Sequence, residues 1–278
     1  MICFPNAKIN LGLHIVSRRQ DGYHNLETVF YPVALKDALE IIPTPVGVST
    51  KLSRKFRFFQ TGIPVTGNEE DNLVIKAFKL VSAGREIPGT DIYLLKKIPL
   101  GAGLGGGSSD AAFMLRLLND SYELGYSGND LLRFAEMLGA DCPFFILNTP
   151  MFATGTGNIL EPVALDLSNY RVLLVKPDIE VSTKEAFDMI TPRQPEVSLK
   201  EIVKRPVSDW KEWMKNDFEA AIFKKYPEIC KIKQQLYDLG AVYAAMSGSG
   251  SSVFGLFLSK PEPGDMFENC FVWNDQDL

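Results

Sequence analysis

Histidine and cysteine are scarce in this sequence. Among 278 residues there are two histidines and four cysteines, and no pair of cysteines has the C-x-x-C spacing of a zinc site. A chain of this length buries a large core without cross-links, so it needs no disulfide framework. We therefore expect free thiols, buried or half-exposed, in a reducing compartment. The cysteines are Cys3, Cys142, Cys230 and Cys270.

Long apolar runs and an excess of basic residues are also missing. No stretch approaches the roughly 20 apolar residues of a membrane span. The N-terminal segment lacks the basic-then-apolar order of a signal peptide, since Lys8 and Asn10 interrupt it. The net charge of −5 gives no long-range attraction to nucleic acid or to an anionic membrane. The sequence therefore predicts a soluble cytoplasmic protein without either partner, while a local cluster of N–H groups and lysines can still bind an anionic small molecule.

Strand-like and helical segments alternate, which predicts a mixed α+β protein. Residues 7–16 alternate between apolar and polar side chains, as in a half-buried strand whose polar face, with Lys8, Asn10 and His14, can line a site. Further strands are expected at 26–35, 38–44, 55–61, 91–100 and 170–178, with strand pairs or tight loops at 151–163 and 241–259.

Helical spacing occurs in three places. Residues 68–84 form the first helix, with Asp71 or Asn72 as the N-cap and Gly84 at the end. A second helix follows Ser108, Ser109 and Asp110, whose side chains are favoured at N-caps, and a third covers residues 129–139.

The predicted secondary structure changes around residues 155–170, after which an apolar strand is followed by mostly helical segments. This predicts a boundary near residue 158, with domains at 1–158 and 159–278.

A glycine-rich stretch, "PLGAGLGGGSSDAA" at residues 99–112, stands between an expected strand and a helix. Five glycines in seven positions are costly in folding entropy, and they permit positive φ and close approach of a ligand to the backbone. A glycine-rich turn that opens a helix directs several N–H groups at one point, which suits a phosphate.

Two familiar phosphate sites do not fit this stretch. The P-loop requires a lysine after its last glycine, and none follows here. The dinucleotide pattern G-x-G-x-x-G matches at Gly101, Gly103 and Gly106, but it requires a second strand after the helix, where this sequence has a polar loop and another helix. A nicotinamide-dependent oxidoreductase therefore remains only as an alternative from another class.

Three ordered motifs point elsewhere. The glycine stretch, "PNAKINLGL" at 5–13 and "MSGSGSSVFGLF" at 246–257 resemble the kinase superfamily of galactokinase, homoserine kinase, mevalonate kinase and phosphomevalonate kinase. "RRQDGYHNLETVF" after the first motif and "GADCPFF" after the third helix resemble, within it, the 4-diphosphocytidyl-2-C-methyl-D-erythritol kinase family. Homoserine and mevalonate kinases are the nearer alternatives, and a catalytically dead nucleotide-binding module is another.

The resemblance implies a fold and a reaction. The fold would be a ribosomal-S5-like ATP-binding domain followed by a ferredoxin-like substrate domain. The enzyme would use ATP and Mg²⁺ to phosphorylate a hydroxyl of a small molecule, a CDP-linked polyol, in the non-mevalonate route to isoprenoids, as a monomer or homodimer. The family's catalytic pair falls on Lys8 and Asp141: Asp141 would act as general base and Lys8 would hold it ionised and oppose developing charge.

The same resemblance assigns the binding residues. Ser108 or Ser109 could reach Mg²⁺, and no metal-binding carboxylate is assigned. The expected ATP-binding residues are Pro99, Leu100, Gly101, Ala102, Gly103, Leu104, Gly105, Gly106, Gly107, Ser108 and Ser109. The expected substrate-binding residues are Asn10, Tyr23, His24, Phe187, Gly248 and Gly250, of which Tyr23, His24 and Phe187 would hold the cytosine.

Overall fold

The computed structural model describes residues 1–44, 56–65 and 67–275, which form two compact units that interleave along the chain. The first unit comprises Met1–Ala7, Leu35–Leu100 and Gly105–Asn148. The second comprises Lys8–Ala34, Gly101–Leu104 and Thr149–Leu278. These units do not coincide with a single division at residue 158, because Lys8–Ala34 belongs with the C-terminal part. The domains 1–158 and 159–278 stay a prediction.

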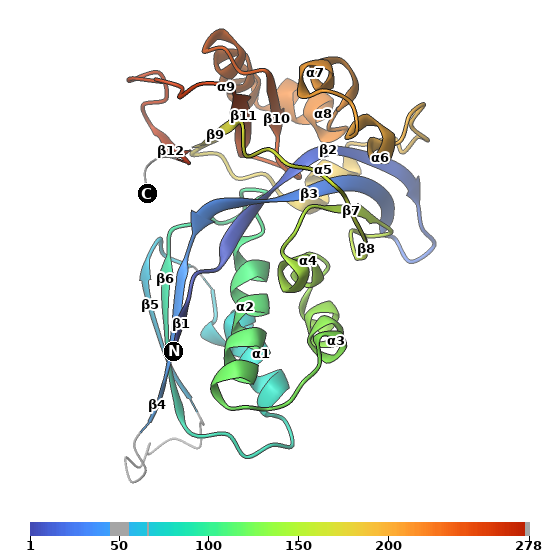
Figure 1. Ribbon diagram of the computed structural model, residues 1–278. Coiled ribbons are helices and arrows are strands. Elements are labelled where there is room, and N and C mark those ends of the chain that lie inside the picture. The colour runs from blue at the N-terminus through green and yellow to red at the C-terminus, as the bar shows by residue number, and fades with distance from the viewer. Residues whose placement is uncertain (45–55, 66, 276–278) are drawn as a thin grey trace. The chain divides into compact units, whose positions relative to one another are not determined.

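A four-stranded sheet with helices on one face makes up most of the first unit (Figure 1). Its strand order is β1 (Ile2–Cys3), β4 (Ala38–Pro43), β6 (Thr90–Lys96), β5 (Phe56–Gly62). Strand β5 runs parallel to β6, and the other neighbours are antiparallel. The helical elements are η1 (Glu69–Asp71), α1 (Leu73–Ser82), α2 (Gly106–Ser121), α3 (Gly128–Leu138) and α4 (Cys142–Leu147).

Local sequence explains these helices. Asn72 caps α1 by accepting the Val74 N–H, as one of the two predicted caps, and Ser127 and Asp130 form a capping box at the start of α3. The apolar faces of α1 and α2 pack on buried residues of β4 and β6 in one core. After α2 the chain enters α3 rather than a second strand, which agrees with the sequence argument against a dinucleotide-binding unit.

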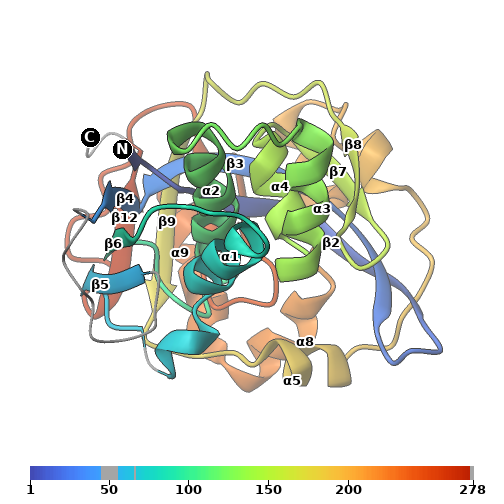
Figure 2. The ribbon, with the colours of Figure 1, turned by 90° about the horizontal axis from the view of Figure 1, so that it is seen from below.

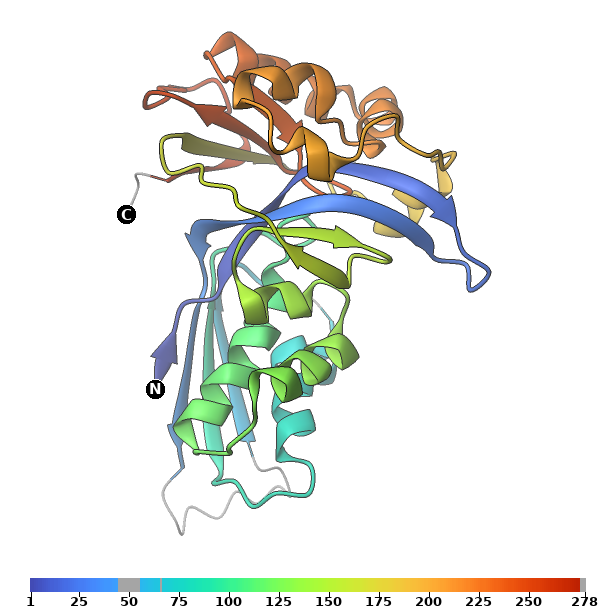
Figure 3. The same ribbon diagram turned by 45° about the vertical axis from the view of Figure 1, so that its right-hand side comes forward.

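Two further sheets belong to the second unit (Figure 3). One has the order β2 (Asn6–Arg18), β3 (His24–Lys36), β7 (Met151–Thr154), β8 (Ile159–Pro162). The other, entirely antiparallel, has the order β10 (Tyr243–Met246), β11 (Val253–Phe257), β9 (Arg171–Pro177), β12 (Cys270–Asn274). The helical elements are α5 (Thr183–Asp188), α6 (Leu199–Ile202), η2 (Val207–Asp209), α7 (Trp210–Trp213), α8 (Phe218–Lys225) and α9 (Pro227–Asp238).

Helices α8 and α9 supply the apolar cover of the antiparallel sheet. Ile222, Ile229 and Leu236 are fully buried in one cluster with Leu173 of β9 and Val253 of β11. Figure 2 shows α8 and α9 from another side. The mixture of helices with largely antiparallel sheets confirms the predicted α+β class.

Two expectations on burial need correction. The polar face predicted for residues 7–16 is not exposed: Lys8, Asn10 and His14 of β2 are all below 10% exposed, because their side chains find polar partners inside the protein. Cys230 is exposed rather than buried or half-exposed, although all four cysteines are free. Strand β5 begins at Phe56, and the earlier part of the expected strand 55–61 lies outside the described residues.

Candidate functional site

The glycine stretch is divided between the two units, and its part from Gly105 onward, in the first unit, forms the start of α2. The residue that precedes the helix is Gly105, with φ of 71°, and no side chain in the described residues caps the helix. The prediction that Ser108, Ser109 or Asp110 is the N-cap is therefore wrong, since all three lie within the helix, near its start. Because an N-cap side chain normally occupies a first-turn N–H, its absence leaves these donors directed at a common point.

The middle of the glycine stretch, residues 101–104, is packed against the Ser247–Ser252 turn of the second unit. The Ser247 hydroxyl donates to the Gly103 carbonyl at 2.9 Å. A Cβ on Gly103 would lie 1.9 Å from the Ser247 carbonyl oxygen, and φ at Gly103 is +73°. Gly248 also lacks space, since its Cβ would lie 3.3 Å from the Gly103 Cα. Only glycine fits where these two backbones meet.

Buried polar side chains of β2 and β3 are connected to this contact by hydrogen bonds. The Lys8 ammonium donates to Asn10 Oδ1 at 2.6 Å and lies 5.0 Å from the Phe30 ring centroid. The Asn10 amide nitrogen donates to the Thr28 hydroxyl at 3.0 Å. The Asn10 backbone N–H donates to the Ser247 hydroxyl at 3.2 Å, which brings Lys8, Asn10, Gly103 and Gly248 together in the second unit.

Asp141 lies in the first unit, immediately before α4. The half-buried Asp141 precedes Cys142, a buried thiol that lies beside the Ser108 hydroxyl. Burial raises the pKa of Cys142 to about 11, and the charge of Asp141 adds to this rise. Cys142 therefore stays a neutral thiol, and the structure places Asp141 and Ser108 beside the same sulfur. Lys8 belongs to the other unit, so its pairing with Asp141 stays a prediction.

The residues predicted to hold the cytosine lie at the hairpin that joins β2 to β3 and on α5. Asp21 accepts the Tyr23 N–H, which orders the turn, and Tyr23 is 64% exposed. The His24 and Phe187 rings stack, with centroids 4.9 Å apart and 14° between their planes. Gly250, with φ of +93°, lies in the Ser247–Ser252 turn rather than at this hairpin. The structure therefore brings His24 and Phe187 together and leaves Tyr23 open to a ligand.

Sequence reasoning missed Ser247, Thr28 and Asn216. The Asn216 amide nitrogen donates to the carbonyls of Met246 and Gly248, each at 2.8 Å, and so holds the backbone on both sides of Ser247. The motif at 246–257 includes Ser247, but only Gly248 and Gly250 were selected from it. Nothing in the local pattern marks Asn216, which is distant in sequence from the residues that it holds.

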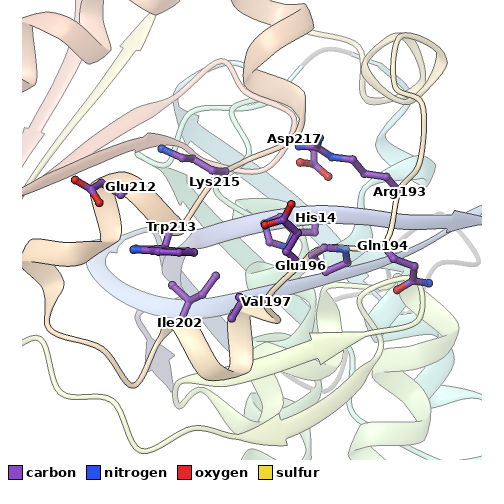
Figure 4. Close-up of a pocket in the computed structure, with 11 residues that line it drawn as sticks. His14, Arg193, Gln194, Glu196, Val197, Ile202, Glu212, Trp213, Lys215 and Asp217 are labelled. Atoms are coloured by element: carbon purple, nitrogen blue, oxygen red, sulfur yellow. The ribbon is translucent and has the colours of Figure 1, made fainter.

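A separate cavity of about 400 Å³ lies in the second unit (Figure 4). Basic Arg193 and Lys215, acidic Asp217 and the Trp213 indole face it, together with His14 of β2. The residues predicted for the kinase site are outside its described lining.

Neither a metal-ligand cluster nor a membrane helix occurs in the described residues. No group of three or more His, Cys, Asp or Glu side chains there is arranged to hold a metal ion. No helix in the same part of the chain has both the length and the apolar character needed to cross a membrane.

Comparisons with known proteins agree with the motifs. The family profile "GHMP kinases N terminal domain" matches residues 72–149, and "GHMP kinases C terminal" matches residues 198–270. A 4-diphosphocytidyl-2-C-methyl-D-erythritol kinase of Parabacteroides distasonis is 58% identical and covers 99% of both chains. A solved 4-(cytidine 5'-diphospho)-2C-methyl-D-erythritol kinase has a TM-score of 0.79 and 31% identity, covering 99% of this chain and 98% of its own. Methanococcus jannaschii mevalonate kinase, at TM-score 0.67, 15% identity and coverage of 99% and 97%, shares the fold alone.

Proposed function

Because the chain belongs to the 4-diphosphocytidyl-2-C-methyl-D-erythritol kinase family of the GHMP kinases, we propose that it transfers the γ-phosphoryl group of ATP to a hydroxyl of 4-diphosphocytidyl-2-C-methyl-D-erythritol. The superfamily was expected from three motifs and the family from the segments "RRQDGYHNLETVF" and "GADCPFF". Both are confirmed, and the protein is a small-molecule kinase. The oxidoreductase alternative is wrong. The reaction places this kinase in isoprenoid precursor synthesis.

One observation carries the proposal: the buried connection from Lys8 through Asn10 and Ser247 to Gly103. Phosphoryl transfer depends mainly on positioning and on neutralising charge, with little covalent chemistry for the protein. Lys8 is only 4% exposed and donates to the Asn10 carboxamide, while the Asn10 backbone N–H donates to Ser247, whose hydroxyl donates to the Gly103 carbonyl. Lys8 thus supplies a fixed positive charge beside the glycine stretch. This connection favours an active kinase over a dead nucleotide-binding module.

The triphosphate is assigned to the glycine stretch. The first-turn N–H groups of α2 and the positive end of its dipole attract anions. Gly101, Gly103 and Gly105 all have positive φ, between 57° and 73°, so that the backbone presents its N–H groups without intervening side chains.

Mg²⁺ is proposed beside the triphosphate. The Ser109 hydroxyl is buried and has no hydrogen-bond partner among the described residues, whereas the Ser108 hydroxyl contacts Cys142. Of the two serines expected at the ion, Ser109 is therefore the one whose buried hydroxyl oxygen still lacks a partner among the described residues. A serine hydroxyl is a suitable Mg²⁺ ligand. When bound, the ion would offset the negative charge of the phosphates.

Asp141 is assigned the general base and Lys8 the cation that keeps it ionised. A carboxylate accepts the proton of the attacking hydroxyl, and an ammonium group opposes the negative charge that develops during transfer. The support is the family's catalytic pattern on both residues, the burial of Lys8 and the position of Asp141 and Ser108 near the same buried thiol, Cys142.

The cytidine end of the substrate is assigned to Tyr23, His24 and Phe187. A stacked imidazole and phenyl ring form a flat platform, and an exposed tyrosine next in sequence can cover a base from another side. His24 also offers ring nitrogens that can bond the edge of cytosine.

Location and assembly complete the proposal. Four free cysteines and a net charge of −5 suit a reducing cytoplasm with no nucleic-acid partner. We assign the protein to the cytoplasm as a monomer or homodimer.

ADP release from ATP and Mg²⁺ tests the proposed function. The expected result is turnover with 4-diphosphocytidyl-2-C-methyl-D-erythritol and none with mevalonate or homoserine at the same concentration. Release at equal rates with mevalonate would refute the substrate, and no release with any of the three alcohols would refute the kinase activity. An Asp141→Asn protein, prepared alongside, controls for contaminating ATPase.

A further inference from the structure

A buried group of three charged residues lies beneath the start of α2 in the first unit. Asp37, Lys96 and Asp110, here called the Lys96 cluster, are each no more than 2% exposed. The Lys96 ammonium donates to Asp37 Oδ2 and, at 2.7 Å, to Asp110 Oδ2. Burying charges is expensive, and a buried ion pair is weak evidence of a gain in stability. The cluster therefore calls for a role beyond holding the fold.

The cluster holds the chain on both sides of the glycine stretch. Before the stretch, Asp37 Oδ1 accepts the backbone N–H groups of Lys97 and Ile98 at 2.5 and 2.8 Å. After it, Asp110 belongs to the start of α2. The two ends of residues 99–109 are therefore linked by two carboxylates, Asp37 and Asp110, that share the Lys96 ammonium.

Close packing reinforces this closure. A Cβ on Gly106 would lie 2.8 Å from Ile98 Cγ2 and 3.2 Å from Lys96 Nζ. The first turn of α2 thus rests directly on the chain that follows β6 and on the Lys96 side chain. A shift of Asp110 away from Lys96 would move the N–H groups of residues 106–109 with it, because they belong to the same end of the helix.

We propose that Asp37, Lys96 and Asp110 are positioning residues for the nucleotide, which hold the first turn of α2 in the geometry that receives the triphosphate. The ligand's identity rests on the proposed function. The cluster acts through the backbone and does not touch the reacting atoms. Preorganised donors bind an anion more tightly than donors that must be ordered on binding, so loosening the cluster weakens ATP binding.

Asp110→Ala is the main test, since it removes the link to α2 and leaves the Asp37–Lys96 pair in place. We expect the Kd of a non-hydrolysable ATP analogue, measured by calorimetry, and the KM for ATP to rise about tenfold or more, as a loss of preorganisation predicts. The KM for the alcohol substrate should stay within about twofold, because this cluster is specific to the phosphate donor side. Asp110→Asn, whose amide oxygen can still accept from Lys96, should recover most of the ATP affinity.

Asp91→Ala is the matched control. Asp91 is a buried aspartate of the same strand as Lys96, paired with Arg57 at the opposite end of β6. Its loss should lower the melting temperature without changing ATP affinity. A merely structural role for the Lys96 cluster would give Asp110→Ala the same result, lowering the folded fraction and apparent kcat with KM unchanged, and would overturn the proposal.

A second variant keeps the test usable if Asp110→Ala does not fold. Both oxygens of Asp37 accept hydrogen bonds, Oδ2 from Lys96 and Oδ1 from the backbone of Lys97 and Ile98, whereas Asp110 accepts through Oδ2 alone. Asp37→Asn must therefore place an amide donor against another donor, which Asp110→Asn avoids, and it should weaken ATP binding without affecting the alcohol substrate. ATP affinity equal to that of the wild type would overturn the proposal. Wild-type protein that fails to bind the ATP analogue would instead refute the proposed function, so the two failures are distinguishable.

Discussion

Gly103→Ala tests the contact between the glycine stretch and the Ser247–Ser252 turn. The φ of +73° at Gly103 costs an alanine about 1–2 kcal/mol. A Cβ placed 1.9 Å from the Ser247 carbonyl oxygen also forces the two backbones apart. This separation breaks the bond from the Ser247 hydroxyl to the Gly103 carbonyl, worth about 1 kcal/mol. The substitution should therefore lower the free energy of unfolding by about 2–3 kcal/mol as a minimum.

Gly101→Ala is the matched control in the same stretch. Gly101 also has positive φ, at +57°, but a Cβ added there would meet no described atom within 4 Å, so only the cost of about 1–2 kcal/mol for the backbone applies. Urea titration gives the free energies of unfolding, and ADP release gives the KM for ATP. We expect Gly103→Ala to be the less stable protein and to lose more ATP affinity. Equal values for the two variants would refute the argument from close packing.

Other substitutions address the proposed reaction, the substrate and the dependence on pH. Asp141→Asn should reduce kcat by about 10²–10⁴ while the melting temperature stays near that of the wild type, and near-normal turnover would remove Asp141 from the mechanism. Tyr23→Ala removes an exposed ring, so it should raise the KM for the cytidine substrate by roughly 2- to 12-fold, the range for one aromatic contact, without changing the KM for ATP. Burial by itself would raise the pKa of Glu27, but hydrogen bonds to His14, Leu199 and Ser198 outweigh burial and lower that pKa overall. When folding lowers the pKa of a carboxyl group, the ionised group stabilises the folded protein at pH values above its pKa in the unfolded chain. This stabilisation is lost as the pH falls through the pKa of the folded state. Glu27→Gln should therefore be less stable than the wild type by about 2–3 kcal/mol at pH 7, and this difference in stability should shrink as the pH falls through the lowered pKa of Glu27; a difference that stays constant across that fall in pH would contradict this.

Local signals in the sequence were sufficient for most elements but not for burial. The alternation in residues 7–16 predicts β2, yet it leaves open whether the polar face meets water. In the folded chain Lys8, Asn10 and His14 bond to other buried polar groups, and one of those partners, Ser247, comes from a distant part of the sequence. Alternation records which residues share a face, and only the tertiary structure decides what covers that face.

The start of α2 shows a second limit. Ser108, Ser109 and Asp110 are good caps by propensity, but the chain reaches helical geometry at Gly106, because Gly105 adopts the left-handed conformation that turns the backbone into the helix. N-cap propensity predicts a helix start at the serines or the aspartate, whereas the conformation of Gly105 sets the start of α2 at Gly106.

The Lys96 cluster was not predictable from any motif. Lys96 is 59 positions from Asp37 and 14 from Asp110, and beside Lys97 it resembles an ordinary strand-end lysine. By contrast, the family motifs selected Gly103, Gly248 and Asn10, which the structure does bring together.

The uncapped start of α2 makes this helix different from α1 and α3, which close their first turns with Asn72 and Ser127. A bound triphosphate would accept the same N–H groups that a serine or asparagine accepts elsewhere, so the nucleotide would complete the secondary structure. Amide hydrogens in the first turn of α2 should then exchange rapidly with solvent in the free protein and slowly in the complex. Amide exchange in the first turn of α2 would therefore report whether the nucleotide is bound.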